Sequence, residues 1–375
     1  MKVQNNNNDV LLNGLPAINI KDKEYILYSP FKKSFIEFEK NKIYDNDFIN
    51  GLEKAGFFNF PNFPKNESQR IVLTITKECN LFCKYCFANC GPEEKSKMLP
   101  ENAISILKEV LDKDGIERIH FTGGEPTLNF ETIKAVVDYI DSNNITPRPI
   151  FYITTNGIVS KHRIDWLLEK KFTFSISWDG LENINELKQR SFASQETSEV
   201  KTRSTIKRVT DAGLPLRVRM AASKLNLSKL LESVKWLAEN GVKFIHIDPV
   251  VPDGRGKEFI SEYGISEEEF LEEFFKIVDF ADNNDIWILN SMISNLYTPK
   301  DYYCTSLKDK IPHFNPDGSI SSCYRVQAYN EKHADLFLFG KFDTRGVYID
   351  GSSEKELLIW ITYNKNGHRT TAYLY

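Results

Sequence analysis

The stretch 79-CNLFCKYCFANCG-91 holds four of the six cysteines in this chain of 375 residues. It directly follows the apolar run 71-IVLTIT-76, which predicts a buried strand, so the cysteines begin a loop at the carboxyl end of that strand. The chain starts with polar residues and shows no apolar segment of a signal peptide. We therefore expect a cytoplasmic protein, in which clustered cysteines indicate metal binding or redox chemistry rather than disulfides.

The spacing of the four cysteines, C-x3-C-x2-C-x3-C, is compatible with three kinds of metal site. A structural zinc site would use all four thiolates. A ferredoxin-like iron–sulfur site would also use four, and the bacterial run C-x2-C-x2-C-x3-C-P has a similar spacing. The third kind uses only Cys79, Cys83 and Cys86, which would hold three irons of a [4Fe–4S] cluster and leave the fourth iron open to a small molecule. The spacing alone leaves all three open.

Strand-like and helix-like segments alternate from residue 71 to the helical segment SEEEFLEEFFKIVDFADNN, which begins with a capping-box pattern at Ser266 and Glu269. This alternation predicts six β/α units, and therefore a parallel sheet with helices outside it. Six units favour an α/β fold of the partial (β/α)6 barrel type over a closed barrel of eight. The loops that follow the strands emerge on one face, which carries the active site in parallel α/β folds.

The two ends of the chain predict further parts. Residues 1–15 are polar and are expected to be disordered, and residues 17–58 predict a small β-β-α unit. The stretch NFPNFPKNESQ is typical of a linker. We therefore expect an N-terminal unit at 1–66, a barrel at 67–290 and a C-terminal extension at 291–375.

Composition sets limits on partners. The chain is 41% hydrophobic and 27% charged, which is enough apolar material for a large core. The 48 Lys and Arg against 52 Asp and Glu give a net charge of −4, without the basic excess of a nucleic-acid-binding protein. No apolar run approaches the length of a membrane span. We therefore expect neither a nucleic-acid nor a membrane partner.

The C-x3-C-x2-C spacing, with the aromatic Tyr85 before its last cysteine, resembles the signature of the radical S-adenosylmethionine (radical SAM) superfamily. Further stretches resemble segments of the same enzymes, in the same order along the chain. They are 122-TGGEP-126, 153-ITTNG-157, 177-SWDG-180 and 249-PVVPDGRGKE-258. Together they carry the resemblance over residues 71–285.

The resemblance implies a [4Fe–4S] cluster on Cys79, Cys83 and Cys86, with SAM bound to the open iron through its amino and carboxylate groups. One electron, supplied by a reductant such as flavodoxin or ferredoxin, would cleave SAM to a 5′-deoxyadenosyl radical that abstracts hydrogen from the substrate. Several other residues would contact SAM. They are Tyr85 near the adenine, Gly123, Gly124 and Glu125 at the amino group, mostly through backbone atoms, Ser177 at the ribose or carboxylate, and Arg190 at the carboxylate, one residue later than the family pattern.

Cys90 is left over from this set. It is either a partly buried thiol without a chemical role, or a hydrogen donor or substrate-linked thiol in catalysis. The zinc and ferredoxin-like possibilities predict that Cys90→Ala loses metal, whereas three-thiolate ligation predicts that metal is retained.

Cys304 and Cys323 lie in 304-CTSLKDKIPHFNPDGSISSCY-324, where NPDG predicts a hairpin turn. Their C-x13-G-x4-C spacing, and 337-FLFGKF-342 after it, resemble the opening of a SPASM or shorter twitch extension. That resemblance implies an auxiliary iron–sulfur cluster on the two cysteines. No cysteine follows Cys323, so we expect either an extension that is truncated or diverged, or a cluster that is incompletely ligated. His313 and His333 are further possible ligands, although we expect both to be surface histidines.

SPASM-type enzymes mostly modify peptides, by crosslinking or epimerisation among other reactions. Tyr324 stands where their sulfatase-maturing branch has an acidic residue, which argues against that branch. The segment after Lys23 resembles the leading part of ribosomal-peptide maturases, so a leader peptide could add to a strand edge there, or the unit could simply cap the barrel. We expect a radical SAM enzyme that abstracts hydrogen from a precursor peptide. The alternative is a degenerate, non-catalytic iron–sulfur and peptide-binding member of the family.

Overall fold

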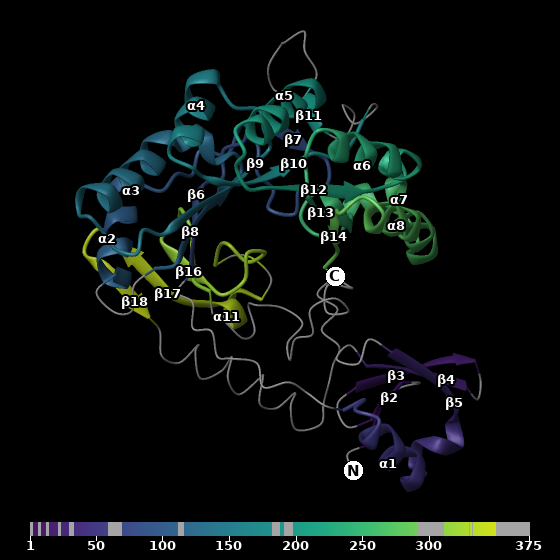
Figure 1. The fold of residues 1–375 in the computed structure, drawn as a ribbon. Coiled ribbons are helices and arrows are strands. Elements are labelled where there is room, and N and C mark those ends of the chain that lie inside the picture. The colour runs from purple at the N-terminus through teal and green to yellow at the C-terminus, as the bar shows by residue number, and fades with distance from the viewer. Residues whose placement is uncertain are drawn as a thin grey trace. The chain divides into compact units, whose positions relative to one another are not determined.

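The structure is a computed structural model, and its helices and strands belong to two units (Figure 1). The first unit runs from β1 (Val3–Asn6) to α1 (Asn46–Lys54), and the second from β6 (Arg70–Thr76) to β18 (Gly346–Ile349). The predicted domain boundaries at 66/67 and 290/291 lie in or beside segments that the structure does not describe, so they stay predictions. The described residues are 3–6, 9–12, 15–21, 24–29, 34–58, 70–111, 116–181, 188–190, 198–291, 311–329, 331 and 333–349.

The first unit is a five-stranded antiparallel sheet with the strand order β1-β2-β3-β4-β5, followed by a short helical segment. Helix α1 begins where the Asp45 carboxylate accepts hydrogen bonds from the N–H groups of Asp47 and Phe48. Its Ile49 and Leu52 pack into the core of the unit. After β1, the elements are β2 (Asp9–Leu12), β3 (Leu15–Lys21), β4 (Glu24–Ser29), β5 (Ser34–Glu39), the 3-10 helix η1 (Lys40–Tyr44) and α1.

This sheet is larger than the β-β-α unit that the sequence predicts. The expected disorder of residues 1–15 is wrong for β1 and β2, which pair with each other and then with β3. The asparagine-rich segment lacks the alternation of apolar and polar residues that identifies a strand. Its order comes from backbone pairing with neighbouring strands, which a sequence pattern does not display.

The second unit is built on an 11-stranded sheet with the order β14-β13-β12-β10-β9-β8-β6-β15-β16-β17-β18. From β14 to β6 every neighbouring pair of strands is parallel. After β6, these strands are β8 (Arg118–Gly123), β9 (Ile150–Thr155), β10 (Thr173–Ser177), β12 (Leu216–Ala222), β13 (Phe244–Pro249) and β14 (Trp287–Leu289).

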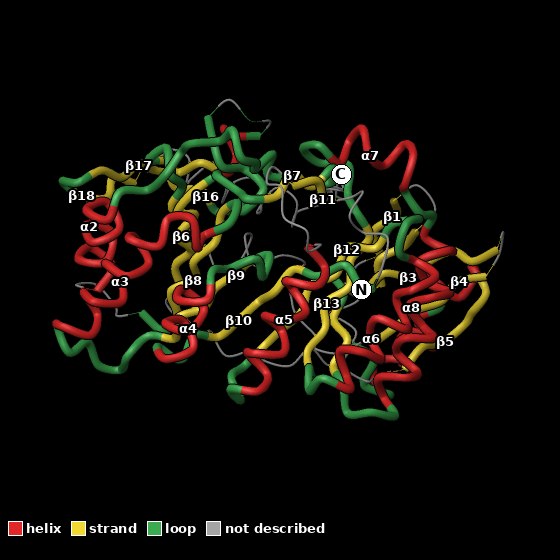
Figure 2. Tube along the Cα trace, turned by 90° about the horizontal axis from the view of Figure 1, so that it is seen from above, coloured by secondary structure: helices red, strands yellow, loops and turns green. Residues whose placement is uncertain are grey.

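Helices follow the parallel strands along the chain and form an arc outside them (Figure 1). Seen from above, α4, α5 and α6 lie on the same side of the strands (Figure 2). The helices are α2 (Pro100–Leu111), η2 (Pro126–Asn129), α3 (Phe130–Ser142), α4 (Lys161–Glu169), α5 (Ser198–Asp211), η4 (Leu227–Lys229), α6 (Leu230–Glu239), α7 (Gly256–Tyr263) and α8 (Glu267–Asp282). The predicted capping box at Ser266 and Glu269 is present at the start of α8. Among the described helices, none has the length and apolar character to cross a lipid bilayer.

Burial explains this layering. On β8 and β9, Ile119, Phe121, Phe151 and Ile153 are almost fully buried, and Phe121 and Phe151 both contact the ring of Phe172. The intervening residues of these strands point to the opposite face, because side chains alternate along a strand.

The parallel strands and the helices between them confirm the predicted α/β fold with six β/α units in a partial barrel. The short strand β14 adds one parallel strand that the sequence pattern does not predict.

The chain after β14 extends the same sheet from its other edge. Strand β15 (His313–Phe314) pairs in parallel with β6, and antiparallel pairs then lead from β15 to β18. The predicted NPDG turn joins β15 to β16, with Gly318 at φ +86 and its N–H donating to the Asn315 carbonyl oxygen over 3.0 Å. The other elements here are β16 (Ser319–Ser321), α11 (Ala334–Phe337) and β17 (Leu338–Asp343).

Candidate active site

The cysteine loop lies at the carboxyl end of β6 and gathers all four of its cysteines into one packed cluster with Leu81, Ala88 and Ile158. Cys79 and Cys90 are buried, and Cys83 and Cys86 are half-buried. Part of the loop is the short strand β7 (Leu81–Cys83), which pairs with β11 (Lys188–Arg190). The loop therefore has strand pairing of its own.

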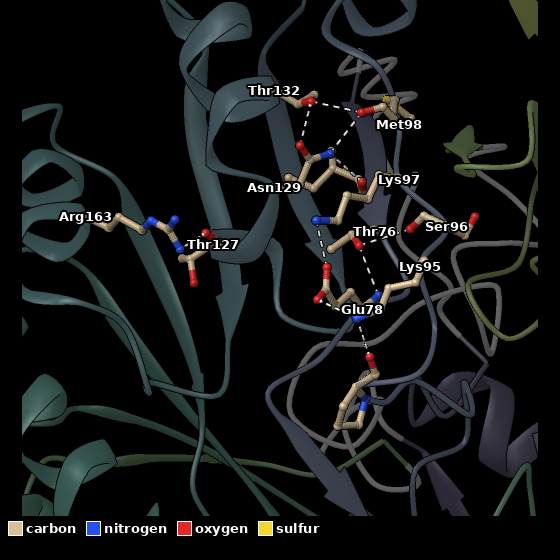
Figure 3. A network of polar contacts seen from close by, with 12 residues as sticks. Thr76, Glu78, Lys95, Ser96, Lys97, Met98, Thr127, Asn129, Thr132 and Arg163 are labelled. Carbon is tan, nitrogen blue, oxygen red and sulfur yellow. Dashed lines mark hydrogen bonds and ion pairs between the residues drawn. The ribbon is translucent and has the colours of Figure 1, made fainter. Parts of the chain in front are cut away.

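A polar network anchors the chain on both sides of the cysteine loop (Figure 3). The Thr76 hydroxyl donates to the Ser96 carbonyl oxygen over 3.0 Å and accepts from the N–H of Glu78. The Glu78 carboxylate pairs with Lys95 at 3.1 Å and with Lys97 at 2.7 Å. The segment before the cysteine loop is thus joined directly to the segment after it. These contacts hold the two ends of the loop close together.

The glycines of 122-TGGEP-126 let this segment approach the cysteine loop at backbone contact. A Cβ atom on Gly123 would lie 2.1 Å from the carbonyl oxygen of Thr76, and one on Gly124 would lie 2.4 Å from that of Glu78. The N–H of Gly124 donates to Thr76 and that of Glu125 to Glu78, over 2.8 and 2.9 Å. Only glycine fits at these two positions, because any larger side chain would collide with backbone atoms.

The Glu125 side chain belongs to the scaffold behind this loop. It is fully buried, and its carboxylate accepts hydrogen bonds from the N–H groups of Thr127 and Asn156 and from the hydroxyls of Thr127 and Thr155. Burial raises the pKa of Glu125 above its ordinary value, against these hydrogen bonds, which lower it. The Glu125 carboxylate is thus already occupied, and a ligand at this turn would meet backbone atoms.

Asn156, in the stretch 153-ITTNG-157, connects the end of β9 to the first cysteine. Its side-chain amide donates to Asn80 Oδ1 over 2.7 Å and to the Cys79 sulfur over 3.7 Å. Its Oδ1 accepts from the N–H of Ile158 over 2.8 Å. The sequence predicts that this motif belongs to the site. It does not predict the contact with the cysteine sulfur, because a motif match does not show where a side chain points.

Tyr85 reaches from the cysteine loop to the end of β10, where its hydroxyl donates a hydrogen bond to the Asp179 carboxylate. Asp179 also accepts the N–H of Ala221 over 2.9 Å. Burial, followed by the charge of Asp179, raises the pKa of Tyr85 well above its ordinary value. The Tyr85 ring packs edge-on against Phe259, with ring centroids 6.0 Å apart. Sequence reasoning placed Tyr85 in the site but missed Asp179 as its partner.

Sequence reasoning also missed the role of Arg255. It belongs to the predicted stretch 249-PVVPDGRGKE-258, and it binds three carbonyl oxygens of the cysteine loop. Its backbone N–H donates to Cys86 over 3.1 Å, its Nε to Cys83 over 2.9 Å and its terminal nitrogen to Cys90 over 2.6 Å. Its guanidinium also lies 4.0 Å from the centre of the Phe82 ring. One residue, through its side chain and its backbone N–H, thus contacts the cysteine loop at three carbonyl oxygens.

The thiols differ in acidity. Burial, followed by the charge of Glu125, raises the pKa of Cys79 to about 12. A hydrogen bond with the Cys90 thiol lowers the pKa of Cys86, and the same bond raises that of Cys90. A buried thiol such as Cys79 stays protonated in the absence of a cation, so a bound metal is what would stabilise its thiolate.

Three further residues that the sequence predicts for the site are Ser177, Arg190 and Cys90. Ser177 ends β10 on the face of the sheet opposite the helices, and Arg190 lies on β11, directly opposite Leu81 of the cysteine loop. The backbone of Arg190 is thus brought to the loop. Cys90 is 3% exposed, and this burial does not suit a thiol that has to reach a substrate. Its catalytic role stays a prediction without structural support.

The predicted auxiliary cluster is tested at only one of its two cysteines, because Cys304 lies outside the described residues. Cys323 is buried among apolar side chains of the C-terminal segment, including Val326 and Phe337. The expectation of a surface histidine is wrong for His313, which lies in the sheet on β15 and is half-buried. It is wrong for His333 as well, which precedes α11 and is half-buried. The auxiliary cluster and the SPASM-type extension stay predictions.

Comparison with known proteins identifies the family. The model of the Radical SAM superfamily matches residues 73–261. The uncharacterized protein MJ0907 of Methanocaldococcus jannaschii is 31% identical over 257 residues, which span 68% of this chain and 84% of that protein. A probable GTP 3′,8-cyclase of Sulfurisphaera tokodaii is 28% identical over 70% of this chain and 82% of its own length. The sporulation killing factor maturation protein SkfB of Bacillus subtilis is 25% identical over 53% of this chain and 47% of its own length.

Two solved structures share the fold. The structure of anSMEcpe with bound AdoMet (SAM) has a TM-score of 0.59 at 20% identity, over 77% of this chain and 80% of that one. The structure of Streptococcus suis SuiB bound to the precursor peptide SuiA has a TM-score of 0.53 at 13% identity, over 94% of this chain and 88% of that one. At these identities the likeness is one of fold.

A parallel partial barrel with a cysteine loop after its first strand is the architecture expected of a radical SAM protein. With the family match over residues 73–261, this chain belongs to the Radical SAM superfamily, which confirms the predicted family. Membership implies a [4Fe–4S] cluster and SAM as cofactors, and it supports an enzyme that acts by radical chemistry.

Proposed function

We propose that this chain is a radical SAM enzyme that matures a ribosomally synthesised peptide, by crosslinking or epimerisation. The fold likeness to SuiB in its complex with a precursor peptide carries this proposal. That likeness covers 94% of the chain, so it includes at least part of the N-terminal unit. SkfB, a relative named as a maturation protein, adds support.

We assign Cys79, Cys83 and Cys86 as the ligands of the cluster. The three cysteines share one packed group, and soft thiolates are the ligands that iron–sulfur clusters prefer. Within the described residues, no three His, Cys, Asp or Glu side chains converge closely enough for a single metal ion. We prefer a cluster of several irons to a zinc site because Cys79, Cys83 and Cys86 match the three-cysteine pattern C-x3-C-x2-C.

We assign the SAM site to the loop ends above these cysteines. The N–H groups of Gly124 and Glu125 already donate to the cysteine loop, so the amino group of SAM, itself a donor, would meet carbonyl oxygens of this turn. Tyr85, Ser177 and Arg190 complete the proposed SAM contacts. When bound and given one electron by an external reductant, the cofactors would supply reductive cleavage of the SAM sulfonium and hydrogen abstraction from the substrate.

We assign leader-peptide binding to the outer edge of β5 in the N-terminal unit. Strand β5 pairs only with β4 in the described sheet, so its other edge presents backbone donors and acceptors to which a peptide strand can add. Phe35 on this strand is 65% exposed, which provides an apolar contact for the added peptide.

The radical chemistry is tested first. The protein is reconstituted with iron and sulfide without oxygen, and SAM and dithionite are added, with Cys83→Ala as the control. We expect 5′-deoxyadenosine from the wild type and none from the variant. A wild-type protein that holds its cluster and binds SAM, yet forms no 5′-deoxyadenosine, is instead the degenerate, non-catalytic member of the family.

The substrate is tested next, with short peptides encoded beside this chain in one set of reactions and GTP in another. We expect a peptide to lose two hydrogen atoms on crosslinking, or to gain solvent deuterium on epimerisation. Conversion of GTP without any change in the peptides would assign this chain to the activity after which the Sulfurisphaera relative is named, and would overturn the peptide proposal.

The β5 edge is tested by binding of the same peptides to Phe35→Asp. The matched control is Phe275→Asp, because Phe275 is the same residue type, is 57% exposed and belongs to helix α8 of the second unit. We expect weaker binding for the Phe35 variant only. Equal binding by both variants and the wild type would remove β5 as the docking strand and leave the barrel chemistry untouched.

A further inference from the structure

The parallel sheet of the second unit has an inner face, defined here as the face opposite its helices. On β12, Val218 and Met220 are buried on the helix side, and on β13 Ile245 and Ile247 are fully buried. The residues between them therefore belong to the inner face. The register between strands extends this assignment across the sheet, because residues directly paired in neighbouring strands share a face.

The charged side chains of this inner face are mostly basic. Within the described strands, its single carboxylate is Asp248, which lies 2.8 Å from His246. The arginines assigned to it by alternation and register are Arg70, Arg118, Arg217 and Arg219. Its histidines are His120, His246 and His313, of which burial keeps His120 and His313 neutral at pH 7. An apolar or uncharged substrate does not require such a surface, and a cationic one would be repelled.

Arg219 differs from the other arginines of this face because it is exposed. Arg118 lies over the Tyr152 ring, with its guanidinium 5.6 Å from the ring centre, and Arg70 lies 3.8 Å from Glu117. In the part of the chain that the structure describes, no carboxylate lies within ion-pair distance of Arg219. An exposed guanidinium in mid-strand, with no acidic partner among the described residues, is available to a ligand.

The direction of the Arg219 side chain is supported by its effect on another strand. Burial, followed by the charges of His313, Arg219 and Arg118, lowers the pKa of His120 on β8 to about 3. The register places Arg219 and His120 on the same inner face, so the two side chains leave the sheet on the same side. In register, Arg219 stands between Ser177 on β10 and His246 on β13.

Arg219 is also close to the candidate active site along its own strand. Ala221, two residues further on β12 and on the same face, donates its N–H to the Asp179 carboxylate. That carboxylate in turn accepts the hydroxyl of Tyr85 from the cysteine loop. A group bound to Arg219 would therefore be held next to the end of the barrel where the cysteine loop lies.

We propose that Arg219 binds a carboxylate of the peptide substrate, so that the enzyme acts on a peptide with an acidic residue near the attacked position. The inference rests on the proposed peptide function. A guanidinium offers two parallel N–H donors that match the two oxygens of one carboxylate. One exposed guanidinium suits one carboxylate, whereas a nucleoside triphosphate carries several charges and needs several exposed cations.

The test uses the reconstituted protein with SAM and two short probes, acetyl-Ala-Glu-Ala-amide and acetyl-Ala-Gln-Ala-amide, with binding measured by ligand-observed NMR. We expect the wild type to prefer the Glu probe, and Arg219→Gln to bind it at least about tenfold more weakly, as for a lost charge-assisted hydrogen bond. Arg345→Gln is the matched control, because Arg345 pairs with Asp343 on the exposed turn between β17 and β18. Arg219→Glu should reverse the preference, toward acetyl-Ala-Lys-Ala-amide.

The possible outcomes distinguish a failure of the Arg219 proposal from a failure of the proposed peptide-maturation function. Equal binding of the Glu and Gln probes by the wild type, or unchanged binding of the Glu probe by Arg219→Gln, overturns the role of Arg219. Peptide maturation that proceeds normally in Arg219→Gln overturns it too, and leaves the proposed function standing. Tight binding of GTP that depends on Arg219, with no binding of either peptide probe, overturns both.

Discussion

The Arg255 guanidinium donates its Nε–H to the carbonyl oxygen of Cys83 over 2.9 Å, although the two residues are 172 positions apart in the chain. The loop after the sixth strand of the barrel thus holds the loop after the first one. Gly254 makes this possible, because a Cβ atom there would lie 2.5 Å from the Cys86 carbonyl oxygen. The geometry of the cysteines therefore depends on a segment that contains no cysteine.

Replacing Arg255 should release the cysteine loop. Arg255→Met removes two charge-assisted hydrogen bonds and the contact with Phe82, so we expect the reconstituted cluster to lose iron to a chelator about tenfold faster or more. Arg255→Lys keeps the charge but loses the paired N–H donors of the guanidinium. Its rate of iron loss should therefore lie between those of the wild type and Arg255→Met. The rate is followed by iron release and by loss of visible absorbance. Arg345→Met is the control, and equal rates for Arg255→Met and the wild type would contradict the role of Arg255.

The ion pair between Asp253 and Arg325, at 2.7 Å, should couple the barrel to the C-terminal segment. Both side chains are about one-quarter exposed, so we expect a coupling free energy of about 1 kcal/mol or less. A double-mutant cycle with Asp253→Asn and Arg325→Gln measures it through the free energy of unfolding. Strict additivity of the two substitutions would show that the pair contributes nothing.

Two glycines should respond oppositely to alanine. Gly124→Ala places a Cβ atom 2.4 Å from the Glu78 carbonyl oxygen, so we expect a loss of stability of about 2 kcal/mol or more and weaker SAM binding. Gly51→Ala, in helix α1 with nothing within 4 Å of the new atom, should stabilise the first unit by about 0.5–1 kcal/mol. Calorimetry of both variants measures the shifts in Tm. A neutral Gly124→Ala would mean that the two loops separate easily.

His120 and His313 should stay neutral between pH 5 and pH 8. Burial lowers the pKa of His120 to about 3 and that of His313 to about 4, from an ordinary value of 6.5. Below pH 6.5 the unfolded chain binds protons that the folded chain does not. Stability is therefore lost as pH falls from about 6.5 toward 4, by at most about 1.4 kcal/mol per pH unit for each histidine.

The measurement is an NMR titration of the histidine Cε1–H signals, assigned with His120→Gln and His313→Gln. The His120→Gln variant keeps a donor for Thr154, which lies 2.8 Å from the His120 Nε2. A signal of either histidine that shifts with a midpoint near 6.5 would show that the ring is solvated and not buried.

The sequence predicts those parts of the site that consist of consecutive residues. The cysteine spacing, Tyr85 and the Gly-Gly-Glu turn are local patterns, and strand–helix alternation gives the barrel. Arg255, Asn156 and Asp179 were inside predicted motifs, yet their partners were not predicted, because these contacts join loops that are distant in the chain. The side chains of β12 show a further gap: the alternation in LRVRMAA marks a strand, but only the register with β10 and β13 reveals that Arg219 shares a face with His246.

The pairing of β15 with β6 has a consequence for synthesis of the protein. The β6 strand emerges from the ribosome early, whereas its neighbour at residues 313–314 is translated after the rest of the barrel. At about 5–20 residues per second, one edge of β6 waits on the order of ten to fifty seconds for its partner. An open edge on a nascent chain is a place where two chains can join, so slow translation or crowded polysomes should favour aggregation of this protein before its last strands arrive.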